Sequence, residues 1–265
     1  MPWFARGGAI ADQPVIEYRL MHTANEHASS LGIEHIEYRD EIQHEGFPVL
    51  KHKVNMVLSL PDSEGELWGG FTSKLRSQIR RPQRENPEIQ IGGDELVNQF
   101  YTVYTRNMRD LGSPAHSKQL VINMLHNFPN NSWIIVLRLN NQPVAAGFLL
   151  GMNDTLEIPL ASTIRNVNAL SMNMLLYWNV LKFAIEKGYK NFDFGRSSLG
   201  TGTYRFKKQW GAEPIQLYWH YWLGTGELPS LNPSNPKYEL LINVWKRLPL
   251  IFTRWLGPLI VKHLP

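Results

Sequence analysis

Hydrophobic and polar positions follow two rhythms between residues 88 and 224, which predicts a mixture of strands and helices. Apolar residues at alternate positions, or in short runs, predict strands at 89–91, 133–139, 144–152, 156–161, 191–195 and 215–222. Helical spacing predicts helices at 94–111, 118–127, 170–187 and 204–209. The predicted order is therefore strand, two helices, three strands, helix, strand, helix and strand.

Residues typical of turns and helix ends support these boundaries. Asp94 is a helix-capping residue type at the start of the first helix, and Gly188 follows the long helix as expected just beyond a helix end. Asn140 and Asn141 predict a tight hairpin between two strands.

The first ninety residues predict a different and shorter arrangement. We expect a strand near 4–10, a helix at 14–31 ended by Gly32 and a strand at 33–38, then a strand at 54–60 and a basic helix at 64–84. This order is that of the back half of a second, similar unit. No strands precede Met1 to complete it, so we expect a shortened first unit.

The last forty residues predict a linker followed by an amphipathic tail. Prolines at 229, 233 and 236 indicate the linker, and residues 238–264 mix apolar and basic side chains in a helix that Pro249 and Pro258 should break. Two interpretations stay open: a strap packed across the core, or a helix that binds a membrane surface or a partner. The expected regions are therefore 1–87, 88–224 and 225–265.

Composition limits the chemistry without identifying it. The 265 residues are 43% hydrophobic and carry a formal net charge of +4, which permits a phosphate-bearing ligand without demanding nucleic acid, and we expect no DNA partner. The chain has no cysteine, which excludes thiol catalysis, thiolate-bound zinc and disulfides. The sequence shows no secretory signal and no apolar stretch long enough to span a bilayer. We therefore expect a cytoplasmic protein, at the inner face of the membrane if the tail binds there.

The order of elements resembles that of the GNAT acyltransferase fold, an α/β (α+β) class. The resemblance implies one complete unit, plus the C-terminal part of a preceding unit. It also implies that two central strands, here 156–161 and 191–195, splay apart and hold the acyl donor and acceptor in the gap.

Residues 192–211, FDFGRSSLGTGTYRFKKQWG, hold the strongest candidate for chemistry. Gly195, Gly200 and Gly202 permit positive φ angles and close approach of backbone N–H groups to a phosphate or an oxyanion. Basic residues surround this glycine-rich loop: Arg196, Arg205, Lys207 and Lys208. The glycine spacing is neither a Walker loop nor a dinucleotide fingerprint, so an exposed basic connection is the alternative.

The same run resembles the signature of the FemAB-like peptidyltransferase family, in particular the subgroup associated with exosortase and exopolysaccharide systems. Segments 75–81 (LRSQIRR), 106–112 (RNMRDLG) and 173–178 (NMLLYW) extend the resemblance over most of the chain. It implies paired GNAT-like halves and transfer of an amino acid from aminoacyl-tRNA to an amine of a peptidoglycan precursor. The family's Phe-Lys pair at the transfer site corresponds here to Phe206 and Lys207.

The predicted catalytic residues are Lys207, Phe206 and Asp193. A fixed ammonium at Lys207 can stabilise the oxyanion that forms when an amine attacks an ester or thioester. Asp193 is the nearest candidate base for the amine proton, although a strand-end carboxylate that pairs with Arg196 or caps the loop is the alternative. We predict that Lys207→Ala lowers turnover about a hundredfold and leaves the fold intact.

Other residues are candidate substrate contacts. Arg165 and Asn173 lie where GNAT enzymes bind the pyrophosphate of coenzyme A, but the expected Gly-rich pattern is absent, which argues against ordinary acetyl-CoA use. Contact with an anionic substrate or tRNA, or simple solvation, is open for Arg76, Arg80 and Arg109. The remaining candidates are Gly195, Arg196, Ser197, Gly200, Gly202, Tyr204, Lys208 and Trp210. Aromatic residues on the last strand suggest sugar stacking or core packing, and the histidines show no metal-ligand spacing.

Together these residues predict an N-acyl or aminoacyl transferase that modifies a small-molecule or lipid-linked envelope or exopolysaccharide precursor by direct transfer. We expect no tightly bound cofactor, and aminoacyl-tRNA or acyl-CoA as donor and co-substrate. The alternatives are transfer from acyl-CoA or an acyl carrier, and a ligand-binding module of the same fold that lacks turnover.

Overall fold

The computed structural model describes residues 6–224, 228 and 236–262. The chain forms two compact units, which we treat separately. The first unit combines residues 1–57, 195–208 and 212–233, and the second combines residues 58–194, 209–211 and 234–265. The expected region boundaries at residues 87 and 224 stay predictions. The proline linker lies largely outside the described residues.

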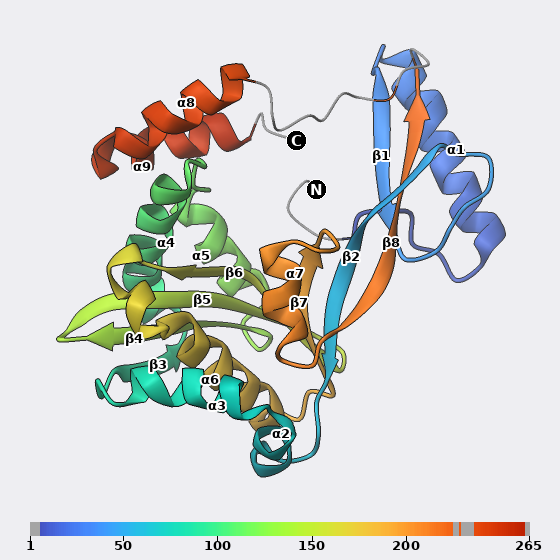
Figure 1. Cartoon of the computed structure of the whole chain (residues 1–265). Coiled ribbons are helices and arrows are strands. Elements are labelled where there is room, and N and C mark those ends of the chain that lie inside the picture. The colour runs from blue at the N-terminus through green and yellow to red at the C-terminus, as the bar shows by residue number, and fades with distance from the viewer. Residues whose placement is uncertain (1–5, 225–227, 229–235, 263–265) are drawn as a thin grey trace. The chain divides into compact units, whose positions relative to one another are not determined.

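The second unit is built on a sheet in the order β7-β6-β5-β4-β3 (Figure 1). Its strands are β3 (Glu88–Gly92), β4 (Ser132–Leu139), β5 (Gln142–Met152), β6 (Thr155–Thr163) and β7 (Asn191–Ser197), of which β7 continues into the first unit. Neighbouring strands are antiparallel from β3 to β6, and β6 and β7 are parallel. Asn140 and Asn141 both have positive φ in the β4–β5 turn, as the sequence predicted.

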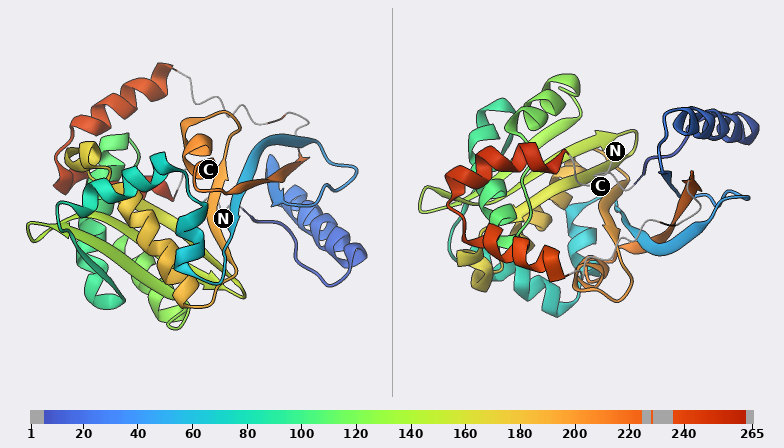
Figure 2. Two further views of the ribbon diagram at one scale, coloured as in Figure 1. Left: turned by 60° about the horizontal axis from the view of Figure 1, so that its bottom comes forward. Right: turned by 90° about the horizontal axis from the view of Figure 1, so that it is seen from above.

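Helices cover both faces of this sheet. Two of them, α4 (Val97–Leu111) and α5 (Lys118–Asn127), pack on one face, whereas α6 (Met172–Glu186) packs on the other with α3 (Ser73–Gln83) against it (Figures 1 and 2). Because the sheet is covered twice, consecutive residues of β4 from Ile134 to Leu137 are all buried. The mixed α/β class and the GNAT-like order of elements are therefore confirmed.

Among its described residues, the first unit combines an antiparallel sheet with a long N-terminal helix and the short helix α7 (Gly202–Lys208). Its strands are β1 (His35–Asp40), β8 (Glu213–Leu223) and β2 (Val49–Ser59), with β8 in the middle. The helix α1 (Pro14–Ser30) packs on β1 through a buried hydrogen bond of 2.7 Å from the Tyr38 hydroxyl to Asn25 Oδ1. Gly32 follows the helix with a φ of +67°, as expected for its end.

Four local predictions need correction. The helix expected at 64–84 is two helices, α2 (Glu64–Gly70) and α3, because the Thr72 side chain caps a new helix after buried Phe71. Asp94 begins the short 3-10 turn Asp94–Leu96 instead of capping α4. In the described part of the expected strand 4–10, Gly7 makes one isolated bridge, to Arg39. Pro258 lies inside a helix that it does not end.

The C-terminal tail forms two helices, α8 (Pro236–Arg247) and α9 (Leu250–Val261), which separate at Pro249 as predicted. Both pack against α4 or the residues just after it (Figures 1 and 2). The Trp245 indole donates to the Ser113 carbonyl at 3.0 Å, and Arg254 Nε donates to Thr105 Oγ1 at 3.0 Å. The tail is therefore a strap on the second unit.

Among the helices in the described ranges, none combines the length and the apolar character that crossing a bilayer requires.

Candidate functional site

The pairing of β6 with β7 ends early and opens the centre of the second unit's sheet. Register runs over three residue pairs, from Thr155 opposite Asn191 to Glu157 opposite Asp193. Strand β6 continues to Thr163 and stays paired with β5 along that length. The sequence predicted this separation of two central strands. It leaves the backbone groups of the last part of β6 without β7 as a neighbour, which is where ligands bind in open α/β sheets.

A cavity of about 420 Å³ lies where β6 ends and α6 begins. It is lined by Asn107, Leu111, Thr163, Arg165, Asn168 and Asn173. The predicted contacts Arg165 and Asn173 therefore border the same space. Asn107 also borders it, and the sequence analysis did not single this residue out.

The polar groups of this cavity suit an anionic or carbonyl-bearing ligand. Asn173 lies in the first turn of α6, where the helix dipole is positive. Asn107 Nδ2 donates to Ser162 Oγ at 3.2 Å, and the Arg165 guanidinium donates to the backbone carbonyl of Asp110. Arg165 is exposed, so its charge can also face a ligand from the rim.

In the first unit, Lys207 fixes the loop between β7 and α7 (Gly202–Lys208). Its side chain is 9% exposed, and Nζ donates to the carbonyls of Gly195 at 2.9 Å and Arg196 at 2.8 Å. Gly195 has a φ of +77°, a conformation that glycine adopts without strain. Two of the three N–H donors of the ammonium therefore stabilise the backbone conformation at the end of β7. The sequence did not predict this structural role.

The rest of this loop is more open than its base. Residues 199–203 are exposed, as is Lys208, whose ammonium pairs with the Glu213 carboxylate at 2.8 Å. Gly200 has positive φ, but Gly202 does not, because it begins α7. Tyr204 and Phe206 are half-buried on that helix. The expected backbone freedom therefore applies to two of the three glycines.

Two arginines lie over Trp219 on β8 of the first unit, and a lysine is close to one of them. The guanidinium carbons of Arg39 and Arg196 lie 4.5 Å and 5.5 Å from the centre of the indole ring. Lys53, on β2, donates from Nζ to Ser198 Oγ at 2.7 Å. We call Arg39, Lys53 and Arg196 the cation cluster. Of its members, the sequence analysis identified only Arg196.

Electrostatics shows that these charges are close enough to affect one another. Burial and the neighbouring Arg196 lower the pKa of Lys53. Burial and Arg39 lower the pKa of Arg196, which Glu37 partly offsets. Like charges brought together in a half-buried place are stabilised when an anion binds among them. The cluster is therefore suited to a phosphate or carboxylate.

Several predicted residues lie in the core instead of on an open surface. Asp193 is buried at the last paired position of β7. Ser197 is buried as well, and its hydroxyl has no hydrogen-bond partner among the described residues. In the second unit Trp210 is buried against Phe71 and Phe194, so it supports the core near the end of β7.

The aromatic residues of β8 favour packing over sugar stacking. Leu217, Trp219 and Tyr221 form a buried cluster on one face of the strand. The Tyr221 hydroxyl bonds to the Glu37 carboxylate, and its pKa is raised by burial and by this bond.

The basic residues on α3 and α4 contact neighbouring side chains and backbone within the second unit. The Arg80 guanidinium lies 5.2 Å from the ring centre of Trp68, and Arg76 is half-buried on the same helix. Arg109 donates to Asp110 Oδ1 at 2.7 Å and to the carbonyl of Leu248 at 3.2 Å. Arg109 therefore links α4 to the strap. Its guanidinium has protein partners, so the residue has a structural role that does not require a ligand.

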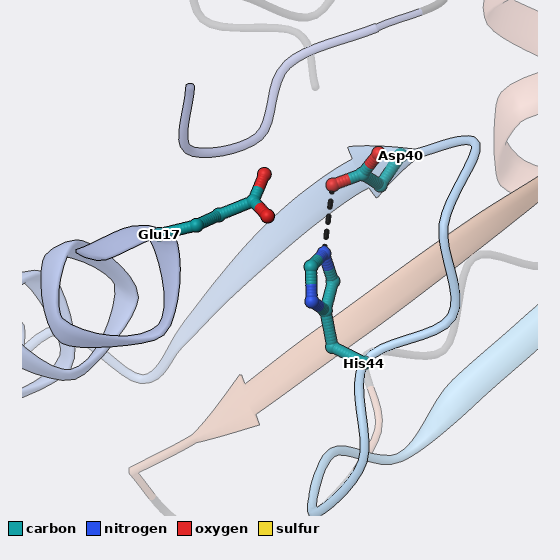
Figure 3. A group of neighbouring side chains, drawn as sticks. All are labelled: Glu17, Asp40 and His44. Atoms are coloured by element: carbon teal, nitrogen blue, oxygen red, sulfur yellow. Dashed lines mark hydrogen bonds and ion pairs between the residues drawn. The ribbon is translucent and has the colours of Figure 1, made fainter. Parts of the chain in front are cut away.

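Glu17, Asp40 and His44 bring metal-ligating atoms together in the first unit (Figure 3). Their ligand atoms lie within 4.8 Å of one another. His44 Nε2 is already hydrogen-bonded to Asp40 Oδ2 at 2.8 Å, and the other oxygen of Asp40 accepts from the backbone N–H groups of Glu41 and Ile42. These hydrogen bonds give Asp40 and His44 a structural role, because they stabilise the turn after β1. The expected absence of a metal stays a prediction.

The separated strands, the cavity at the start of α6 and the basic loop after β7 are the features of an acyltransferase of the GNAT type. Residues 73–208 match the family described as Acetyltransferase (GNAT) domain, and the chain belongs to that family. No curated protein matches the chain in sequence.

Solved structures share the fold at low sequence identity. FemX has a TM-score of 0.61 and 12% identity over 76% of this chain and 75% of its own. L-PGS from Bacillus licheniformis has a TM-score of 0.55 and 16% identity over 77% and 68%. A tandem GNAT protein from the clavulanic acid biosynthesis pathway has a TM-score of 0.51 and 9% identity over 82% and 73%. The likeness to FemX agrees with the FemAB-like resemblance of the sequence.

Proposed function

We propose that this acyltransferase moves an acyl or aminoacyl group directly onto an amine of a phosphate-bearing precursor of the cell envelope or of an exopolysaccharide. The observation that carries the proposal is the cation cluster, in which Arg39 and Arg196 lie over Trp219 and Lys53 is close enough to Arg196 for that charge to lower the pKa of Lys53. Phosphate groups of a nucleotide-linked or lipid-linked precursor are anions of the required charge. The FemAB-like resemblance of the sequence implies a peptidoglycan-type acceptor, and FemX shares the fold.

The reaction needs no covalent enzyme intermediate. The amine nitrogen attacks the carbonyl carbon of the donor, the bond from that carbon to the ester oxygen or thioester sulfur breaks, and the amine proton passes to the leaving group. In this proposal the positive charge of Lys207, which follows Phe206 on α7, stabilises the oxyanion. Asp193 is the proposed base that takes the proton from the amine and returns it to the leaving group. In this proposal Tyr204 and the glycines of the loop border the substrates.

Two acyl donors are compatible with this reaction. We favour aminoacyl-tRNA, because the loop before α6 lacks the Gly-rich pattern of coenzyme A sites and because the FemAB-like resemblance implies an aminoacyl donor. The second candidate is an acyl-CoA, which the family supports. For that donor, Arg165 and the first turn of α6 around Asn173 would meet the pyrophosphate.

Ligand-induced stabilisation and product formation test the proposal together. We expect a UDP-linked peptidoglycan precursor to raise the melting temperature, and mass spectrometry to detect the precursor with an added acyl or aminoacyl group when a donor is present. Lys53→Met should abolish most of the shift. Lys51→Met is the matched control, because Lys51 is exposed on the same strand and bonds to Gln43.

The outcomes separate the alternatives. Product from acetyl-CoA but not from aminoacyl-tRNA would change the donor and keep the enzyme class. A precursor shift without product from either donor would favour a binding module. No shift with any phosphate-bearing precursor, or equal shifts in the Lys51 and Lys53 variants, would refute the role of the cation cluster.

A further inference from the structure

The strap formed by α8 and α9 has an inner face that packs closely against the rest of the second unit. Gly257 lies so close to the connection after α4 that an added Cβ would be 2.9 Å from the carbonyl oxygen of Ala115. Gly112 is equally close to α8, because a Cβ there would lie 2.5 Å from Ile242. With the hydrogen bonds of Trp245 and Arg254, these contacts fix which side of the strap faces inward.

The outer face of the strap is apolar and exposed. On α9, Ile251 is 74% exposed and Trp255 is 69% exposed, and with Leu259 they follow a four-residue spacing along one side of the helix. The other large apolar side chains exposed on the two helices are Leu240, Leu241, Val244, Phe252 and Ile260. So many apolar side chains on one continuous element mark an interaction surface.

The charge of the strap indicates what covers this face. From Leu240 to the last residue the sequence has four basic residues and no Asp or Glu. Lys246, Arg247 and Lys262 are exposed, at the ends of the two helices. Glu239, in the first turn of α8, is the one acidic residue of the two helices in the sequence. A helical surface that combines Trp, Phe and Leu side chains with an excess of flanking cations is complementary to an anionic lipid surface, where the rings enter the headgroup region and the cations meet phosphates.

We propose that the strap docks the protein on the surface of an anionic lipid bilayer, with the face around Ile251 and Trp255 buried in the headgroup region and the cations at the helix ends paired with lipid phosphates. The helices lie along the surface and do not cross it. The proposal does not depend on which acyl group the enzyme transfers.

Vesicle flotation of the full chain tests this docking. We expect binding to vesicles of phosphatidylcholine mixed with phosphatidylglycerol, weaker binding to phosphatidylcholine alone, and weakening by salt. The double variant Ile251→Ser/Trp255→Ser should reduce binding roughly tenfold or more, because two large side chains no longer insert. Lys246→Glu/Arg247→Glu should remove the preference for phosphatidylglycerol.

The control is a matched change on another exposed helix. Val15 and Leu20 are exposed apolar residues of α1, whose sequence includes Glu17 and Glu26. Val15→Ser/Leu20→Ser should leave vesicle binding unchanged, and unchanged melting temperatures in all variants would show that the fold is kept.

Two results would overturn the proposal. One is equal vesicle binding by the unmodified chain and the Ile251/Trp255 variant. The other is absence of vesicle binding together with self-association that the same variant abolishes in sedimentation velocity, which would make the face a contact between two copies of the chain.

Discussion

Replacement of Lys207 by methionine removes a buried ammonium and keeps most of the side chain's volume. The ammonium donates to two backbone carbonyls, of Gly195 at 2.9 Å and of Arg196 at 2.8 Å. A hydrogen bond with a charged partner contributes about 1.5 to 3 kcal/mol. Two such bonds give about 3 to 6 kcal/mol before any compensation. The variant also avoids the cost of burying a charge, so we expect a net loss of about 2 to 4 kcal/mol.

Urea unfolding followed by circular dichroism measures this loss. Lys208→Met is the matched control, because the neighbouring Lys208 is exposed and its ammonium pairs with the Glu213 carboxylate on the surface, so its removal should change the free energy of unfolding little. An unfolding free energy of Lys207→Met equal to that of the control would refute the structural role of the ammonium.

The same variant distinguishes two roles of Lys207, a structural role in the loop after β7 and a catalytic role in stabilising an oxyanion. Loss of an oxyanion donor lowers kcat by roughly a hundredfold or more. We expect that loss in Lys207→Met at a temperature where the variant is still folded, with little change for Lys208→Met. Near-normal turnover in folded Lys207→Met would leave Lys207 a structural residue only. The structure thus adds a stability cost to the sequence prediction that removing this lysine leaves the fold intact.

Three further changes test the packing and titration of the second unit. Burial lowers the pKa of His116 to about 4. The unfolded state therefore takes up a proton first, and the free energy of unfolding should fall as the pH drops from 6.5 toward 4. Urea unfolding at several pH values should show this slope, and His116→Gln should flatten it; an equal slope in the variant would refute the assignment. Gly112→Ala should cost more than about 1 kcal/mol in urea unfolding, since φ is +84° and Ile242 blocks the new Cβ; no change would refute that packing. Gly257→Ala should loosen α9 from Ala115 and speed limited proteolysis of the strap, and an unchanged cleavage rate would contradict the close contact.

Most helices and strands were predictable because their capping residues and the spacing of their apolar positions match the face that is buried in the structure. The helix Lys118–Asn127 was predicted to the residue, since Ser117 caps it and its apolar stripe is regular. The division of the basic segment into α2 and α3 was missed, because it depends on Phe71 entering the core, a tertiary effect that the regular basic pattern conceals. Pro258 was expected to end α9. Only three residues follow it in the helix, and close packing at Gly257 holds the last turn in place.

The candidate site was predictable where its residues are neighbours in sequence. Arg165 and Asn173 flank the start of one helix, so their position followed from the element order. The cation cluster was not predictable in the same way, because Arg39 and Lys53 come from strands far from Arg196 in the chain. The antiparallel pairing of β8 with β1 and β2, which sets Arg39 opposite Trp219 and Lys53 opposite Leu217, brings these residues together.

The two units are interwoven along the chain, because the first is assembled from three separate stretches and the second takes the intervening ones. Residues 195–208 leave the second unit in the middle of β7 and return to it after Lys208. A single cut therefore cannot yield one intact unit and one remainder. Fragment expression, domain exchange with relatives and circular permutation should all be planned around these crossing points, and an insertion near residue 194 would affect both folding units at once.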